Sequence, residues 1–259
     1  MQGSPELLIA GFAVGLMIGL TSMGGAALMT PFLVLILGMK PSLAIGSDLV
    51  YAAITKFVGG WVHWRQGTVD VNLAKRLAYG SVPGGLMGVL CITVVREKIG
   101  AEALNLFLRR SIGITLTVVA AIILIRTLWG ARLQMQAHRF HRRQSEMTII
   151  WGALVGFTVG LTSIGSGSLL MPFLALLYPL APATMVGTDV FHACILLSVT
   201  GVLHWGAGNV DWPLVLWLLA GSLPGVYLGS RLAPVVPDRL LKVGLSLTLF
   251  TAGAFMVPK

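Results

Sequence analysis

Long runs of apolar residues fill most of this chain, and short polar connections separate them. Several runs reach at least about 18 residues, the length at which a helix can cross the hydrocarbon core of a bilayer. The pattern therefore predicts an all-α polytopic membrane protein, a multi-pass protein of the cell (inner) membrane.

The first apolar run, residues 5–38, is too long for one straight crossing. At 1.5 Å per residue it would reach about 50 Å, against a hydrocarbon core of ~30 Å. Its middle holds Gly19-Leu20-Thr21-Ser22-Met23-Gly24-Gly25, in which Thr and Ser favour helix caps and glycines permit unusual backbone angles. We therefore predict two shorter helices, about 6–22 and 25–38, that form a hairpin.

The same stretch returns 141 residues later as Gly160-Leu161-Thr162-Ser163-Ile164-Gly165-Ser166. At this offset, 29 of the 70 residues at positions 19–88 are identical to their counterparts, without a gap. Shared hydrophobicity does not keep polar and rigid residues in register, yet the matches include Pro41/Pro182, Asp48/Asp189, His63/His204 and Asp70/Asp211. Internal duplication with breaks at matching positions is typical of transporters, in which the breaks mark the binding site.

The repeat divides the chain into two halves around a basic linker at residues 129–146. The first half, residues 1–128, is expected to contain the hairpin 6–38 and helices 43–64, 72–95 and 103–128. The second half, residues 147–259, is expected to contain the hairpin 147–178 and helices 183–205, 212–233 and 238–257. Each half thus consists of a broken-helix hairpin and three transmembrane helices.

The distribution of basic residues favours halves of opposite orientation. We place the linker in the cytoplasm and leave out Lys56, which lies inside an apolar run; inverted halves then put 11 of the remaining 17 basic residues inside. Parallel halves put nine of them inside. Because cytoplasmic loops are enriched in Lys and Arg, we expect two inverted repeats.

The composition agrees with this interpretation. Of the 259 residues, 56% are hydrophobic and only 10% are charged, whereas soluble domains carry about 25% charged residues. The net charge of +9 lies largely in loops, where it sets topology, so we expect no nucleic-acid partner. Cys91 and Cys194 lie singly in apolar runs, which predicts neither a disulfide nor a metal site. The sequence contains no P-loop motif, and we expect no cofactor.

The two breaks carry the chemistry of an anion site. Unwound backbone survives in a bilayer only against protein or a wet cavity. The helix that restarts after each break offers free N–H groups and a partial positive charge, and nearby hydroxyls add donors. A packing hairpin without a ligand is the alternative. The candidate substrate-binding residues are Thr21, Ser22, Met23, Gly24, Gly25, Thr162, Ser163, Ile164, Gly165, Ser166 and Gly167.

Four polar residues inside the apolar runs are candidates for gating or proton coupling. Asp48 and Asp189 match in the repeat, and they either carry protons or pin the neighbouring hairpin. His192 follows Asp189 by one helical turn and could share its proton. Lys56 has Leu197 as its repeat counterpart, and it either pairs within the bundle or attracts the anion.

Two further histidines, His63 and His204, end their helices, and each is followed by Trp. We interpret them as interfacial anchors that lie far from the breaks. This interpretation argues against a Ser-His intramembrane protease. No Cys, His or carboxylate cluster accompanies them in the sequence, so they do not predict a metal site.

Together these motifs resemble those of the TauE/SafE family of sulfite and organosulfonate exporters, also called the toluene-sulfonate uptake permease type. The resemblance rests on residues 19–31 with their copy at 160–172, on the Gly-Ser/Thr-Asp motifs, and on the His-Trp-x-x-Gly-x-Val-Asp ends at 63–70 and 204–211. It implies a transporter of small sulfur-containing anions, such as sulfite or sulfoacetate. Ala26 departs from the more glycine-rich first break that family members often have.

The sequence thus predicts a secondary transporter, an exporter by the resemblance, whose partners are the lipid bilayer and a small inorganic or organic sulfur anion. The anion is expected to bind between the mirrored breaks near the membrane midplane. An anion channel, an uptake permease for a related oxyanion and, more remotely, an intramembrane enzyme remain as alternatives. The sequence leaves the oligomeric state open.

Overall fold

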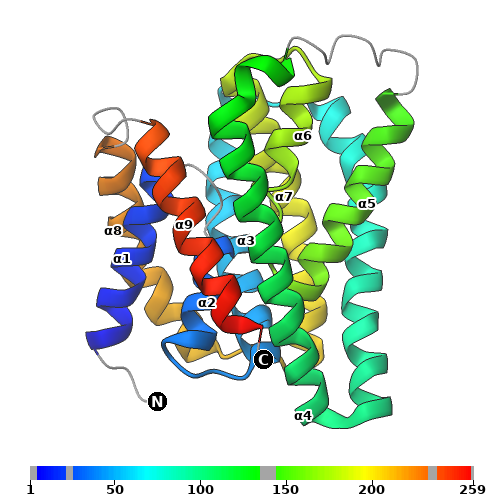
Figure 1. The fold of residues 1–259 in the computed structure, drawn as a ribbon, viewed down its shortest axis with the longest axis vertical. Coiled ribbons are helices and arrows are strands. Elements are labelled where there is room, and N and C mark those ends of the chain that lie inside the picture. The colour runs from blue at the N-terminus through cyan, green and yellow to red at the C-terminus, as the bar shows by residue number, and fades with distance from the viewer. Residues whose placement is uncertain (1–4, 22–25, 135–143, 233–237, 258–259) are drawn as a thin grey trace.

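The computed structural model describes residues 5–21, 26–134, 144–232 and 238–257. Across these ranges the chain forms nine α-helices and no strand, which confirms the predicted all-α fold class (Figure 1). The helices are α1 (Pro5–Thr21), α2 (Ala26–Leu35), α3 (Pro41–Arg65), α4 (Val71–Gln134), α5 (Gln144–Thr162), α6 (Leu170–Leu177), α7 (Pro182–Gly206), α8 (Trp212–Leu232) and α9 (Asp238–Met256).

Helix α4 is a hairpin of two arms rather than one rod. Gly100 has φ 82° and ψ 171°, a conformation that glycine adopts readily and other residues avoid. Figure 1 shows α4 turning back at its lower end. The two arms, residues 71–99 and 101–134, therefore run antiparallel.

Proline and aspartate set where the central helices begin. Pro41 and Pro182 open α3 and α7, where the missing N–H of proline has no intrahelical partner to lose. Asp70 precedes α4 and accepts a hydrogen bond from the backbone N–H three residues on, at 3.0 Å. Asp211 does the same before α8, at 3.1 Å. Both aspartates are thus helix N-caps.

Helices α3 and α7 pack against each other and run antiparallel. The start of α3 touches the end of α7, because a Cβ on Gly46 would overlap the backbone of Asn209. The start of α7 touches the end of α3 in the same way, because a Cβ on Gly187 would overlap the backbone of Thr68. The glycine of each Gly-Ser/Thr-Asp motif therefore has a packing role.

Two mirrored hydrogen bonds reinforce these contacts. The Asp70 N–H donates to Thr188 Oγ1, and the Asp211 N–H donates to Ser47 Oγ, each at 2.9 Å. Positions 47 and 188, like positions 70 and 211, correspond at the 141-residue offset. In the first bond the donor belongs to the first half of the chain and the acceptor to the second half. In the second bond the two halves have the opposite roles. This reciprocity is the mark of an approximate two-fold relation.

The outer helices also pack against helices of the opposite half. α1 packs along α8, and α5 packs along the first arm of α4. In Figure 1, α1 begins at the lower end of the molecule, whereas α5, its counterpart in the repeat, begins at the upper end. α1 and α5, like α3 and α7, therefore run in opposite directions.

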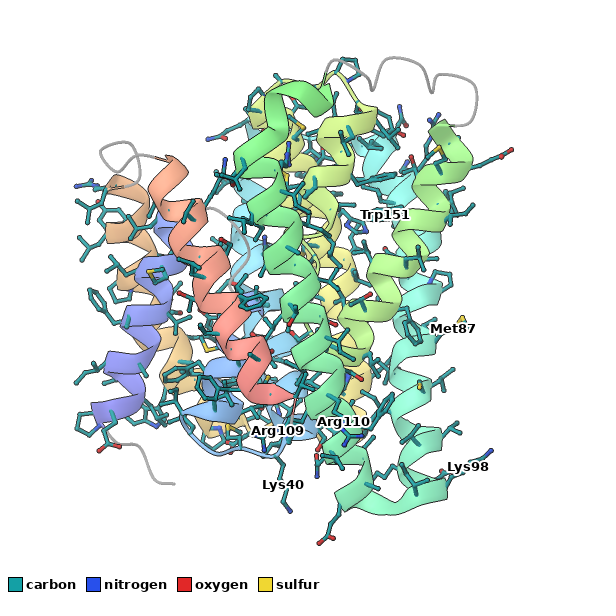
Figure 2. The ribbon with its side chains drawn as sticks, in the orientation of Figure 1. Lys40, Met87, Lys98, Arg109, Arg110 and Trp151 are labelled. Carbon is teal, nitrogen blue, oxygen red and sulfur yellow. The ribbon has the colours of Figure 1, made fainter. Side chains whose placement is uncertain are left out.

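The helices have the length and surface of membrane spans. Five of them in the described ranges are long and apolar enough to cross a bilayer: α3, α4, and α7, with most of α5 and α8. Large apolar side chains such as Met87 point outward (Figure 2), and Met87 is 62% exposed. Lys40, Lys98, Arg109 and Arg110 lie toward one end of the molecule in the same view.

Aromatic clusters mark the ends of the central helix pair. The ring centroids of Trp61 and Trp64 lie 5.5 Å apart near the end of α3, and the Arg65 guanidinium carbon lies 4.8 Å from the centroid of the Trp61 ring. The ring centroids of Trp205 and Trp212 also lie 5.5 Å apart, near the end of α7. Because α3 and α7 are antiparallel, the two clusters lie at opposite ends, as in the aromatic belts of membrane proteins.

Candidate functional site

The candidate anion site is described on one of its two sides. Of the first break, Ser22, Met23, Gly24 and Gly25 lie outside the described residues, and Thr21 ends α1. The second break, residues 163–169, connects α5 to α6 and is fully described. The structure of the candidate site is therefore known at the second break.

The second break leaves helical geometry at two residues. Ser163 has φ 64°, which is uncommon for a residue with a side chain, and Gly165 has φ 130°. The Thr162 hydroxyl donates to Thr158 O at 2.7 Å and accepts the Ile164 N–H at 3.3 Å. The chain is thus held at the end of α5 while its direction changes.

The break presents donors in a buried place. Ser163 is 0% exposed, Ser166 is 2% exposed and Ser168 is 4% exposed. Within the described ranges, the backbone N–H groups of residues 165–168 have no hydrogen-bond acceptor. They directly precede α6, so they share the partial positive charge of a helix N-terminus. Such a segment suits an anion.

Asp48 is joined to this break. Its Oδ2 accepts hydrogen bonds from Ser163 Oγ at 3.0 Å and from Thr30 Oγ1 on α2. The Asp48 side chain is 0% exposed, and its Oδ1 has no partner among the described residues. Three segments, α2, α3 and the second break, therefore converge on one carboxyl group.

Asp189 has different surroundings. The Lys56 ammonium lies 4.0 Å from Asp189 Oδ2, and the two side chains are 14% and 6% exposed. Asp189 Oδ1 has no partner in the described part of the chain. Lys56 thus pairs α3 with α7, which is the bundle-pairing alternative left open by the sequence.

His192 faces α4 rather than its neighbour on α7. Its Nε2 lies 2.7 Å from the hydroxyl of Ser81, and both residues are 0% exposed. Its Nδ1 has no partner among the residues described. No hydrogen bond between His192 and Asp189 is present in these ranges, so the expected proton sharing has no direct path there.

The two helix-end histidines differ from each other. His63 is half-buried, and its Nδ1 lies 2.9 Å from Thr68 Oγ1. His204 is fully buried, and its Nε2 lies 3.1 Å from the carbonyl oxygen of Gly160, the first residue of the second break motif. The expectation that both histidines lie far from the breaks is therefore wrong for His204.

Sequence reasoning missed Thr30, Ser81 and His204 as parts of the polar interior. Hydroxyls are common in membrane helices, so Thr30 and Ser81 gave no signal of their own. Thr30 does stand out in one respect, because its repeat counterpart is the apolar Met171. Within the described ranges, no group of three or more His, Cys, Asp or Glu side chains could hold a metal ion.

Comparison with known proteins identifies relatives along nearly the whole chain. The model of the family described as sulfite exporter TauE/SafE matches residues 7–256. The probable membrane transporter protein YjnA of Bacillus subtilis is 37% identical over 98% of this chain and 100% of its own length. YdhB of the same organism and MJ0441 of Methanocaldococcus jannaschii, both named probable membrane transporter proteins, are each 24% identical. YdhB matches over 97% of this chain and 99% of its own length, and MJ0441 over 98% and 95%.

No solved structure matches the chain at a significant level. The family match and the YjnA relative each cover nearly the whole chain, and they agree with a helical bundle that carries spans of membrane length. The chain therefore belongs to the sulfite exporter TauE/SafE family and is a multi-pass membrane transporter.

Proposed function

We propose that the protein is a secondary transporter of small sulfur-containing anions, such as sulfite or short organosulfonates, with export as the direction that the family name suggests. The observation that carries this proposal is the second break. Its hydroxyls and its backbone N–H groups of residues 165–168 are gathered in a segment that the protein buries almost completely.

The donor set favours an oxyanion over a cation. Backbone N–H groups at a helix start and Ser hydroxyls bind oxygen atoms that carry negative charge. No formal cation faces Ser163 in the part of the chain that is described, because Lys56 is paired with Asp189. An anion can therefore be held and released without separating it from a strong ion pair.

The exchanged contacts between the halves suggest how the site opens. We infer that the membrane plane contains the approximate two-fold axis, so that the first break faces the second across the midplane. Rocking of one half against the other would then expose the site to each side in turn. The burial of Ser163, Ser166 and Ser168 matches a conformation closed to both sides.

The enzyme alternative has one feature in its favour, the 2.7 Å contact between Ser81 Oγ and His192 Nε2. Both residues are 0% exposed, and His192 Nδ1 has no carboxylate to orient the ring among the described residues. A hydrolase needs substrate access and an oriented base. We therefore assign this pair to the helix interface and propose that the protein is not an enzyme.

Thermal shift of the purified protein tests the proposal. Sulfite, sulfate, thiosulfate and sulfoacetate are compared with acetate and succinate as carboxylate controls. A ligand at 100 times its Kd stabilises the folded state by about 2.7 kcal/mol, so at least one sulfur anion should raise the midpoint.

Ser163→Ala should abolish that shift, because it removes a hydroxyl of the break. Ser111→Ala is the matched control, because among the described residues the Ser111 hydroxyl bonds to its own helix alone, at Phe107 O. Equal stabilisation of the wild type and Ser163→Ala, or none by any sulfur anion, would contradict the proposed site.

A further inference from the structure

We propose that Asp48 binds one proton together with each transported anion, and that its counterpart Asp189 does not take part in this coupling. The inference rests on the proposed function and deepens it, because it assigns the coupling ion and the residue that carries it.

The two aspartates correspond in the repeat but have different chemical surroundings. Asp48 accepts hydrogen bonds from the neutral hydroxyls of Thr30 and Ser163, whereas Asp189 faces the Lys56 ammonium at 4.0 Å. The counterpart of Thr30 is Met171 and the counterpart of Lys56 is Leu197. Each aspartate therefore has the partner that the other lacks.

Asp48 shares a donor with the proposed anion site. Ser163 belongs to the second break, and its hydroxyl points to Asp48 Oδ2. An ionised Asp48 would occupy this donor and would repel an anion bound beside it, strongly so in a buried site of low dielectric. A protonated Asp48 removes the repulsion.

The other carboxyl oxygen of Asp48 fits the protonated state. Oδ1 is buried and has no partner among the described residues. A protonated carboxyl group gains an O–H donor, which needs an acceptor when it is buried. An oxyanion in the break would provide that acceptor. Proton binding and anion binding would thus favour each other, as linkage requires.

Asp189 needs no proton to balance its charge. Lys56 neutralises it within the α3–α7 interface, and both side chains are largely buried. Breaking such a pair leaves a buried charge without a partner, which is strongly unfavourable. The pair is therefore expected to stay intact through the cycle.

Other titratable groups near Asp48 are few in the described ranges. On α3 itself these are Tyr51, one turn further along, and Lys56, which is paired with Asp189 of α7. The two histidines of α7 face other partners, His192 the Ser81 hydroxyl and His204 the Gly160 carbonyl. The other hydrogen bonds to α3 in these ranges come from uncharged groups, such as the side chains of Thr30 on α2 and Asn105 on α4. Neither of these two titrates.

The coupling has a consequence for direction. One proton moved with one monoanion transfers no net charge, so the membrane potential would not drive the step. Uptake would be favoured by a more acidic exterior, and export would need substrate accumulated inside the cell.

The test measures binding of methanesulfonate to the purified full-length protein between about pH 5 and 8. This sulfonate stays singly charged over that range, whereas sulfite changes its own charge. In the wild type, affinity should fall about tenfold for each pH unit once Asp48 is ionised in the free protein. Asp48→Asn keeps the shape of a neutral carboxyl group, so its affinity should vary less than about threefold over the range.

The matched control is the double variant Lys56→Gln/Asp189→Asn, which removes the other buried carboxylate together with its partner. It should keep the wild-type slope, whatever its absolute affinity. A flat wild-type profile, a wild-type slope in Asp48→Asn, or a flat profile in the double variant would each overturn the assignment. Failure of the wild type to bind any sulfur anion at any pH would instead contradict the proposed function.

A liposome measurement covers the case in which Asp48→Asn folds poorly. An inward methanesulfonate gradient should acidify the lumen of vesicles that contain the wild-type protein, as reported by a trapped pH-sensitive dye. Anion entry without acidification would overturn proton coupling. Acidification that disappears in the double variant but persists in a folded Asp48 variant would assign the proton to Asp189.

Discussion

Ser163 is a residue with a side chain held in the left-handed region, with φ 64°, and it is completely buried. This conformation costs on the order of 1 kcal/mol or more for a residue other than glycine. The Ser163 hydroxyl reaches Asp48, and the Ser163 N–H closes the last turn of α5 through Val159 O at 2.7 Å. The strain therefore positions a hydroxyl that glycine would lack.

Substituting Ser163 separates the backbone role from the hydroxyl. Ser163→Gly removes the strain together with the hydroxyl, so its free energy of unfolding should lie within about 1 kcal/mol of the wild-type value. Ser163→Ala keeps the strain and loses the bond, so it should be less stable by about 1–3 kcal/mol. Both should lose anion binding. Wild-type affinity in Ser163→Gly, measured by thermal shift with sulfite, would show that the hydroxyl is not a ligand.

The Lys56–Asp189 pair makes a separate prediction at the residue scale. Lys56→Met leaves a buried carboxylate without its cation and should destabilise the protein by about 3 kcal/mol. Adding Asp189→Leu removes the orphaned charge and should restore most of that loss. Denaturant titration in detergent measures both. A double variant no more stable than Lys56→Met would mean that the two side chains are not coupled.

At the scale of elements, the helix α3–α7 pair holds the two halves together through glycine contacts and mirrored hydrogen bonds. Gly46 and Gly187 each face the backbone of the opposite half at a distance that excludes a side chain. The Ser47 and Thr188 hydroxyls then accept the N–H groups of the aspartates that cap α8 and α4. The Gly-Ser/Thr-Asp motif thus combines packing, a cap contact and, at Asp48, the link to the break.

Alanine at either glycine should push α3 and α7 apart. We expect Gly46→Ala and Gly187→Ala each to lower the free energy of unfolding by at least about 2 kcal/mol, because overpacked backbone contacts cannot relax easily. Gly244→Ala on α9 is the control, because a Cβ there meets no atom within 4 Å; it should be neutral or stabilising by up to about 1 kcal/mol. Equal thermal midpoints for all three variants would contradict the contact.

The sequence was most informative where polar or rigid residues interrupt apolar runs. It predicted the all-α class, a change of structure within the Thr-Ser-x-Gly stretch, and helix starts near Pro41 and Pro182. It also singled out Asp48 and Asp189, since a charge in an apolar run is conspicuous. Their repeat match suggested one shared role, but the side chains that distinguish them come from elsewhere in the chain.

Partners of the polar interior were not predictable because they join segments far apart. Ser163 lies 115 residues from Asp48, and His192 lies 111 residues from Ser81. A single sequence carries no signal for such pairs when one partner is a common hydroxyl residue. The mismatches in the repeat, Thr30 with Met171 and Lys56 with Leu197, were the available clue to the different surroundings of the two aspartates.

In the whole molecule, α1 and α5 run in opposite directions (Figure 1), and each packs against a helix of the other half. Lys40 lies at the same end as Lys98 and Arg109 (Figure 2), and the second arm of α4 runs from this end to the other (Figure 1). Placed in a bilayer with the linker in the cytoplasm, this arrangement puts Lys40 outside.

Cysteine labelling tests that orientation. Lys40→Cys and Arg239→Cys, each in a Cys91→Ala/Cys194→Ala background, should react with membrane-impermeant maleimide from opposite sides of intact cells and inverted vesicles. Lys40 is expected outside and position 239 inside. Labelling of both from the same side would rule out inverted repeats.

We expect the protein to carry a sulfur anion by alternating exposure of a saturable site that includes Ser163. Counterflow in proteoliposomes tests it most directly: vesicles loaded with unlabelled sulfite are diluted into a trace of labelled sulfite. We predict transient accumulation of label that saturates with sulfite concentration, is absent in Ser163→Ala and persists in Ser111→Ala. Label entry without transient accumulation and without saturation, or counterflow of wild-type size in Ser163→Ala, would contradict carrier transport through a site at Ser163.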